Sequence, residues 1–169
     1  AYPKDELAPN AVYKRLYAHF LAGDEASAEK DLELLRKNYP DSPFTVKGLF
    51  WRADYLRDAK KFDKAEEVLQ DIAAKYAGTP SIAAEAVYEC AYIMSQSGKN
   101  DKAVKYLDEL SEKYPDESIV SEGFMLRGDI YSEASEFEKA IPFYTKAAER
   151  RPGSSLETAC WARLGDCYF

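Results

Sequence analysis

Apolar residues recur at intervals of three and four positions along nearly the whole chain, which is the spacing of amphipathic helices. We find no segment with the alternating pattern of a β-strand. Short polar or glycine-bearing stretches interrupt the helical pattern at residues 22–25, 59–63, 97–101 and 134–137. Connections this short bring the flanking helices side by side in opposite directions. The pattern therefore predicts an all-α fold of antiparallel helix pairs.

The helical pattern also repeats at long range. Tyrosine-proline pairs, or their substitutes, are separated by 37, 37, 38 and 37 residues; they are Tyr2-Pro3, Tyr39-Pro40, Tyr76-Ala77, Tyr114-Pro115 and Arg151-Pro152. An alanine precedes four of the proline positions by twelve residues. These alanines are Ala28, Ala65, Ala103 and Ala140. A period of this length indicates stacked helix pairs.

The period divides the chain into successive units of one solenoid domain spanning residues 1–169. We expect residues 1–7 to end a preceding repeat and residues 155–169 to form the first helix of a truncated one. The full repeats are predicted at residues 8–43, 44–80, 81–117 and 118–154. Neither end carries an evident polar capping helix. We therefore expect a piece of a longer protein, or array ends covered by a neighbouring chain.

The prolines mark the joints between predicted repeats. In "YPDSP", Pro40 ends one helix, Ser42 is placed to cap the next, and Pro43 occupies its first position, where a missing N–H costs nothing. Thr79-Pro80 repeats this arrangement. Pro142 is the exception, because it falls within or just past the first turn of a second helix, where the loss of a donor is tolerated.

A family resemblance appears in the last predicted helix. Trp161, Leu164, Gly165 and Tyr168 have the W-x2-L-G-x2-Y spacing of the first tetratricopeptide helix. Together with the aligned alanines and prolines, this resembles a tetratricopeptide-repeat (TPR) array. The resemblance implies a right-handed α-α superhelix that serves as an interaction scaffold, with first helices lining the concave face. It also implies close packing at one position of each first helix, where the first repeat carries the bulky Leu16 and is expected to deviate.

The period is longer than the usual 34 residues of this family. Repeats of this length with "YPDSP"-like joints resemble those of the bacterial Tol-Pal-associated and outer-membrane assembly lipoprotein TPR proteins. That resemblance favours a periplasmic or outer-membrane-associated location, with the cytoplasm as the alternative. No apolar run is long enough to span a membrane, so we expect no direct membrane insertion of this segment.

Charge and composition exclude several functions. The net charge of −7 and the scattered lysines and arginines argue against nucleic acid as a partner. His19 is the single histidine, and we interpret it as a surface or packing residue rather than a catalytic base. Carboxylate pairs such as Glu66-Glu67 are interpreted as solvated helix faces. Without zinc-ligand spacing or a phosphate-binding loop, we predict no metal, no cofactor and no enzymatic activity.

The three cysteines do not form a disulfide pattern. Cys160 and Cys167 lie on one face of a predicted helix about 10 Å apart, which is too far for a bond. We interpret Cys90 and these two residues as small buried apolar side chains.

The repeat register, combined with the resemblance, selects a candidate binding surface. One inward position of the first helices reads Tyr13, Phe50, Tyr88, Met125 and Ala162, and the position four residues on reads Tyr17, Asp54, Tyr92, Asp129 and Asp166. We predict a peptide-binding groove lined by Tyr13, Tyr17, Phe50, Asp54, Tyr88, Tyr92, Met125 and Asp129. The carboxylate clamp of the chaperone-binding TPR proteins is predicted absent, because aromatic and acidic residues occupy its basic positions.

Two interpretations of these aromatic residues remain open. In the first interpretation, they contact a partner polypeptide that also places a basic residue near Asp54 or Asp129. In the second, they pack within their own repeats. A separate row, Val12, Leu49, Val87, Phe124 and Trp161, is predicted to supply the packing between helices. The sequence thus favours a non-catalytic protein-binding scaffold. The alternatives are self-assembly through exposed array ends and, less favoured, a glycan-binding groove.

Overall fold

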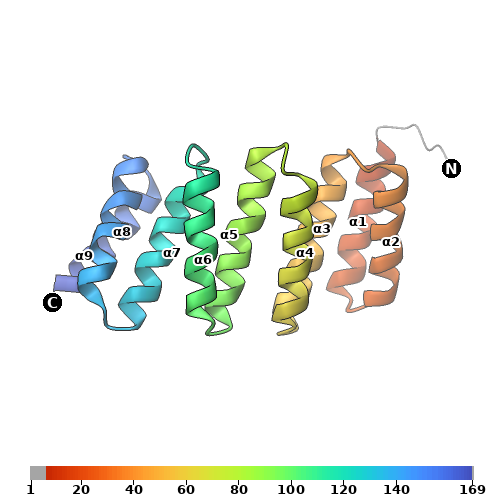
Figure 1. The fold of residues 1–169 in the computed structure, drawn as a ribbon. Helices are drawn as coiled ribbons and strands as arrows, with labels where there is room; N and C mark the ends of the chain where they lie inside the picture. The colour runs from red at the N-terminus through yellow and green to blue at the C-terminus, as the bar shows by residue number, and fades with distance from the viewer. Residues whose placement is uncertain (1–6, 169) are drawn as a thin grey trace. The chain divides into compact units, whose positions relative to one another are not determined.

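The computed structural model describes residues 7–168, which form nine helices joined by short turns (Figure 1). The helices are α1 (Leu7–Leu21), α2 (Glu25–Asn38), α3 (Pro43–Asp58), α4 (Phe62–Lys75), α5 (Pro80–Gln96), α6 (Asn100–Lys113), α7 (Ile119–Glu133), α8 (Phe137–Arg150) and α9 (Ser155–Tyr168). No strand occurs within this described part. The prediction of an all-α helical repeat fold is confirmed. The expected tail of a preceding repeat lies almost entirely outside the described residues.

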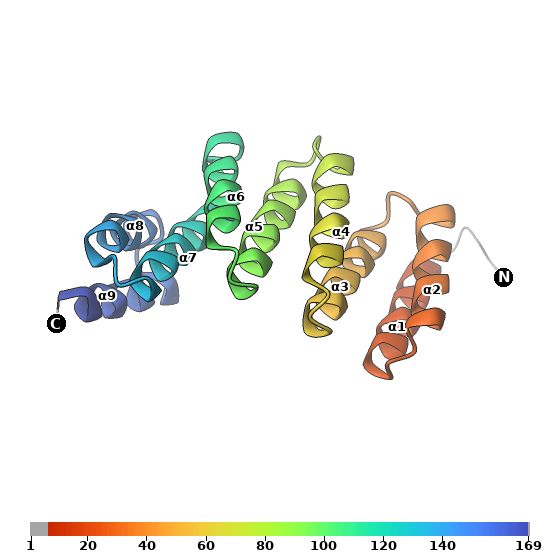
Figure 2. The same cartoon turned by 60° about the horizontal axis from the view of Figure 1, so that its bottom comes forward.

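The chain divides into two compact units, residues 1–72 and 73–169. In the first unit α1 packs against both α2 and α3. In the second unit α5 packs on α6 and α7, and α7 lies between α6 and α8 in both views (Figures 1 and 2). Helix α9 packs on α8 and α7. Each unit therefore has a core of its own.

The hairpin turns share one backbone conformation, a residue with a positive φ, that the sequence pattern alone does not reveal. The residue two positions after each first helix has a positive φ: 73° at Gly23, 56° at Lys60, 75° at Gly98 and 61° at Ser135. A left-handed residue at a helix C-terminus closes the chain into a tight turn, and glycine adopts this conformation at the lowest cost. The second and fourth turns therefore carry a strain that the first and third do not.

The helix starts follow the predicted proline joints in part. The Ser42 hydroxyl accepts a hydrogen bond from the Phe44 N–H at 3.3 Å, with Pro43 at the first helical position, as predicted. Thr79 occupies the corresponding place before Pro80, but its side chain makes no capping bond. Pro142 is the sixth residue of α8, so it lies past the first turn and leaves one helical carbonyl without its usual donor.

The first unit accommodates Leu16 through a glycine in a neighbouring helix. Leu16 is fully buried. A Cβ at Gly48 of α3 would lie 3.2 Å from a methyl group of Leu32 and 3.4 Å from one of Leu16. The absence of a side chain at position 48 therefore provides the room that the bulky leucine needs.

The core of the second unit includes a buried tyrosine packed on a glycine. Tyr144 of α8 is almost completely buried, and its ring covers Gly128 of α7. A Cβ at Gly128 would lie only 2.5 Å from the tyrosine Cε1 atom. Alanines and apolar residues of α8 and α9 complete this cluster: Ala140, Ala147, Ala148, Cys160 and Leu164. Cys160 is thus a buried apolar residue, as predicted, and burial raises the pKa of its thiol.

Two expectations about packing are corrected. Glu66 is buried rather than solvated, at 5% exposure, whereas Glu67 is exposed. Leu49 and Val87 are buried and Val12 and Phe124 half-buried, in line with a packing role, but the Trp161 side chain is 53% exposed. Its indole donates to Glu157 on its own helix, and the helices that contact α9 leave it uncovered.

Candidate functional site

The predicted tyrosines of the first unit are tied to a tryptophan that sequence reasoning missed. The Trp51 indole N–H donates to the Tyr13 hydroxyl at 3.0 Å. Tyr17 meets the same indole edge-on with ring centroids 4.5 Å apart, and Tyr13 also contacts Phe44 at 5.6 Å. Trp51 directly follows Phe50, which the repeat register selected as an inward position, so the sequence analysis missed Trp51 by one residue. These rings hold α1 to α3.

The other two predicted residues of the first unit lie on α3. Phe50 is half-buried. The Asp54 carboxylate accepts from Arg57 at 2.7 Å, one turn along the same helix. Burial raises the pKa of the Asp54 carboxyl, although the Arg57 cation opposes this effect. Asp54 thus already has a cationic partner within its own chain.

The second unit presents the ring pair Tyr88 and Tyr92 on α5. The two rings are stacked, with centroids 6.5 Å apart and planes inclined by 13°. Both residues are half-buried. Burial raises the pKa of the Tyr88 hydroxyl, and the carboxylates of Glu89, Glu122 and Asp129 raise it further. The ring pair therefore lies in a negatively charged environment.

Asp129 joins three helices of the second unit. Its carboxylate accepts from the Tyr144 hydroxyl at 2.9 Å and from the Arg163 guanidinium at 2.5 Å, so it connects α7 with α8 and α9. Met125, one turn earlier on α7, is half-buried and packs against the Tyr144 cluster. Both predicted groove residues therefore also hold the helices of the second unit together.

Two further carboxylates border the ring pair. Glu85 precedes Tyr88 by one helical turn, and although the residue is exposed, desolvation by its surroundings raises the pKa of its carboxyl. Glu122 of α7 forms an ion pair with Arg151 through Oε1. Its other oxygen, Oε2, is buried and has no donor among the described residues. Glu85 and Glu122 occupy the same position in successive repeats, three residues before Tyr88 and Met125. Including the helical turn before the selected inward positions would have identified both glutamates from the sequence.

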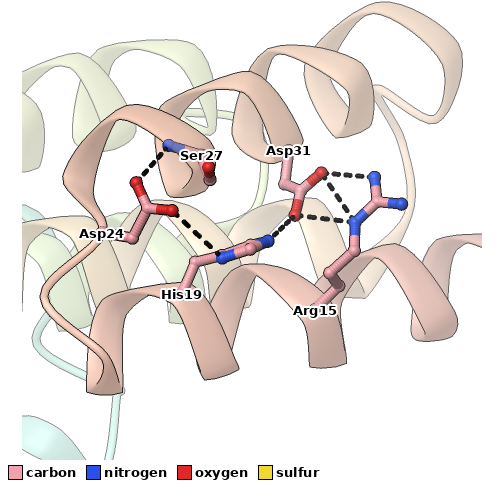
Figure 3. Close-up of polar contacts among 5 residues, drawn as sticks. All are labelled: Arg15, His19, Asp24, Ser27 and Asp31. Carbon is pink, nitrogen blue, oxygen red and sulfur yellow. Dashed lines mark hydrogen bonds and ion pairs between the residues drawn. The ribbon is translucent and has the colours of Figure 1, made fainter.

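The single histidine belongs to an ion network between α1 and α2 (Figure 3). The ring nitrogens of His19 lie 3.7 Å from Asp24 Oδ2 and 3.7 Å from Asp31 Oδ2. Arg15 Nε donates to both oxygens of the nearly buried Asp31 carboxylate, at 3.0 and 2.9 Å. Hydrogen bonds from Ser27 lower the pKa of Asp24, with a smaller contribution from His19.

This network replaces apolar packing of the other repeats. The position of His19 is occupied by Leu56 in the second repeat and by Met94 in the third. The position of Asp31 is occupied by Val68 and by Tyr106. Because both nitrogens of His19 face carboxylates and Arg15 neutralises Asp31, the cluster braces the hairpin of α1 and α2. The interpretation of His19 as a packing residue fits this geometry.

The described residues hold no group of three or more His, Cys, Asp or Glu side chains placed to bind a metal ion. Among residues 7–168, no helix combines the length and the apolar character needed to cross a bilayer.

The chain matches one family model over most of its length, the tetratricopeptide repeat-like domain at residues 4–166. No curated protein sequence matches it. Solved structures show the same fold at low identity. A tetratricopeptide repeat protein from Parabacteroides merdae superimposes with a TM-score of 0.64 at 19% identity, over 95% of this chain and 60% of that protein. The present chain therefore spans less than two thirds of that protein's length.

Two further structures resemble the chain over nearly its whole length. BtubC (BKLC) from P. vanneervenii has a TM-score of 0.72 at 18% identity, covering 99% of this chain and 76% of that one. The MamA protein has a TM-score of 0.64 at 18% identity, covering 97% and 82%. The family match, the repeat register and the helix pairs of the structure agree. The chain belongs to the tetratricopeptide repeat-like family.

Proposed function

We propose that this chain is a non-catalytic scaffold that holds a partner polypeptide in a groove lined by its first helices. The fold generally mediates protein-protein interaction and is typically non-catalytic, which supports the class of function. The candidate contact positions are the inward positions of α1 and α3 in the first unit and, considered separately, those of α5 and α7 in the second. No cofactor is needed for this function.

The stacked pair Tyr88 and Tyr92 is the observation that carries the proposal. Both rings are half-buried, while the apolar core of the second unit is built from other residues, notably Tyr144, Leu107 and Leu110. Rigid aromatic side chains that combine an apolar face with a hydroxyl are the residues most often used as anchors in protein interfaces. The first unit offers less, because its rings are engaged with Trp51.

A random-peptide display selection against the purified chain tests this function. We expect the selected peptides to lose binding to the double variant Tyr88→Ser, Tyr92→Ser. The matched control is Phe137→Ser, which removes a 41% exposed ring from the start of α8, a second helix. Each variant's melting is followed by circular dichroism. Selected peptides that bind the double variant as well as the parent chain would refute the assignment of the surface.

The cellular setting is also part of the proposal. The long period and the "YPDSP"-like joints support a bacterial cell-envelope complex, with a periplasmic or outer-membrane-associated location. Fractionation of the native cells with an antibody to this chain tests the location. Recovery in the cytosolic fraction alone would contradict it.

A second candidate function is self-association through α9. Trp161 and Tyr168, two helical turns apart on this helix, are 53% and 70% exposed, and exposed aromatic residues can mark protein contacts. Sedimentation velocity over a range of concentrations tests this candidate, with Trp161→Ser as the variant expected to remain monomeric. A parent chain that stays monomeric throughout would remove it.

A further inference from the structure

The surface around Tyr88 and Tyr92 has carboxylates that the chain's own cations do not fully satisfy. Glu85 has no ion pair or hydrogen bond among the described residues. Glu122 uses Oε1 for Arg151 and keeps Oε2 buried without a donor. A buried carboxylate oxygen without a donor is unfavourable, because it has lost water and gained nothing in exchange. Glu85 and Glu122 Oε2 therefore keep acceptor capacity that no side chain of the described residues uses.

The surrounding charges are arranged to attract a cation rather than an anion. Glu85 lies one helical turn before Tyr88 on α5. The carboxylates of Glu89 on α5 and of Glu122 and Asp129 on α7 act electrostatically on the Tyr88 hydroxyl. The face of a tyrosine ring is itself electronegative and attracts ammonium and guanidinium groups. Arg151 and Arg163 lie near this face, but each is already paired with a carboxylate.

The first unit provides an internal comparison. Its inward acid, Asp54, is paired with Arg57, and Glu29 on α2 pairs with Arg52 of α3 at 2.6 Å. Its rings are engaged with Trp51. The unsatisfied negative charge and the available rings thus coincide only on the second unit, among the residues described.

We propose that this face of α5 and α7 binds an arginine-bearing basic segment of the partner polypeptide, with the guanidinium stacked on the Tyr88–Tyr92 pair and donating to Glu85 and Glu122. This proposal rests on the proposed scaffold function and specifies the chemistry of its partner. Arginine fits better than lysine because its planar group can stack on a ring while its several N–H donors reach two carboxylates. The net charge of −7 favours encounter with a basic segment.

The proposal is tested with four short labelled peptides that differ only in one repeated residue: arginine, lysine, citrulline or glutamate. Binding to the full chain is measured by fluorescence polarisation at low and at physiological salt. We expect the arginine peptide to bind most tightly and the citrulline peptide, which keeps the shape and loses the charge, to bind at least about tenfold more weakly. The glutamate peptide should not bind.

Charge-removing variants separate a specific site from general attraction. Glu85→Gln and Glu122→Gln should each weaken arginine-peptide binding by about tenfold. Glu149→Gln, which removes one exposed charge from α8, is the matched control and should change it by less than about twofold. Glu85 has no partner to lose, so its substitution tests the site even if Glu122→Gln loosens the Arg151 contact.

Three results would overturn the proposal. Citrulline and arginine peptides could bind equally, the Glu85→Gln variant could behave like Glu149→Gln, or Tyr92→Leu could leave arginine-peptide binding unchanged. If display selection enriches neutral peptides that still require Tyr88 and Tyr92, the scaffold function stands and the basic partner is excluded. If no selected peptide depends on the ring pair, the scaffold surface itself is wrong.

Discussion

The glycines Gly128 and Gly165 occupy the same repeat position but have opposite surroundings, which gives a sharp prediction for their substitution by alanine. At Gly128 an added Cβ would lie 2.5 Å from Cε1 and 2.6 Å from Cδ1 of Tyr144. At Gly165 no atom of the described residues, apart from its chain neighbours and the backbone of its own helix, lies within 4 Å of the added Cβ. The helical backbone is the same at both positions, so the difference in stability reports the packing alone.

The magnitudes follow from two opposing effects. Alanine is favoured over glycine inside a helix by about 1 kcal/mol. Overpacking of a filled core costs about 1–3 kcal/mol, and Tyr144 has little freedom to move because it is buried and its hydroxyl is bound to Asp129. The difference leads us to expect that Gly128→Ala destabilises the second unit by up to about 2 kcal/mol. Gly165→Ala should be neutral or stabilising by up to about 1 kcal/mol.

Thermal unfolding by circular dichroism measures both variants. For a domain of this size, each kcal/mol corresponds to a shift in Tm of about 2–4 °C. Gly123→Ala is an intermediate case, because its Cβ would meet one terminal methyl group of the buried Leu110 at 2.7 Å, a less severe contact than the Tyr144 ring at Gly128. A Gly128→Ala variant that melts at or above the temperature of Gly165→Ala would show that the glycine-tyrosine contact does not hold α7 and α8 together.

Four further substitutions test the local structure. Replacing Lys60, which has a φ of 56°, by glycine should relieve backbone strain and raise the free energy of unfolding by about 0.5–1 kcal/mol, and a lower Tm would contradict the turn geometry. Ser42→Ala should lower the free energy of unfolding by about 0.5–2 kcal/mol, because its capping hydrogen bond is lost. Thr79→Ala loses no such bond and should lower it less, and urea titrations of both variants measure the difference. Asp24→Ala should destabilise the chain at neutral pH. Because hydrogen bonds from Ser27 lower the pKa of Asp24 in the folded state, its contribution is present above the unfolded pKa and is lost as the pH falls through the lower folded pKa. Denaturant titrations at pH 7 and at about pH 2 should therefore show the difference only at pH 7.

The sequence pattern was sufficient for the helices and for part of their joints, because hydrophobic periodicity and proline chemistry act locally, but it did not show that Thr79 makes no capping bond. Ser42 is an example, since its capping role depends only on the residues beside it. The strained turn at Lys60 was not predicted, because a lysine there carries no signal of a positive φ. It became evident only when the four turns could be compared in one register.

The candidate surface was predictable by position but not by partner. The register placed Tyr88 and Tyr92 one turn apart on one face, and the structure shows them stacked. Asp129 was selected as an acid for a ligand, whereas its carboxylate is held by Tyr144 and Arg163 from two other helices. Such contacts depend on side chains distant in the sequence. For the same reason the buried position of Glu66 could not be recognised from its polarity.

The central claim is that a partner polypeptide binds the face of α5 and α7 around the stacked tyrosines. The most direct test is an NMR titration of the chain, with labelled tyrosine rings, by the tightest-binding displayed peptide. The account predicts that the ring signals of Tyr88 and Tyr92 shift first and saturate with the binding curve, while the buried Tyr144 ring changes little. Shifts confined to residues of the second helices α6 and α8, with the Tyr88 and Tyr92 rings unaffected, would contradict it.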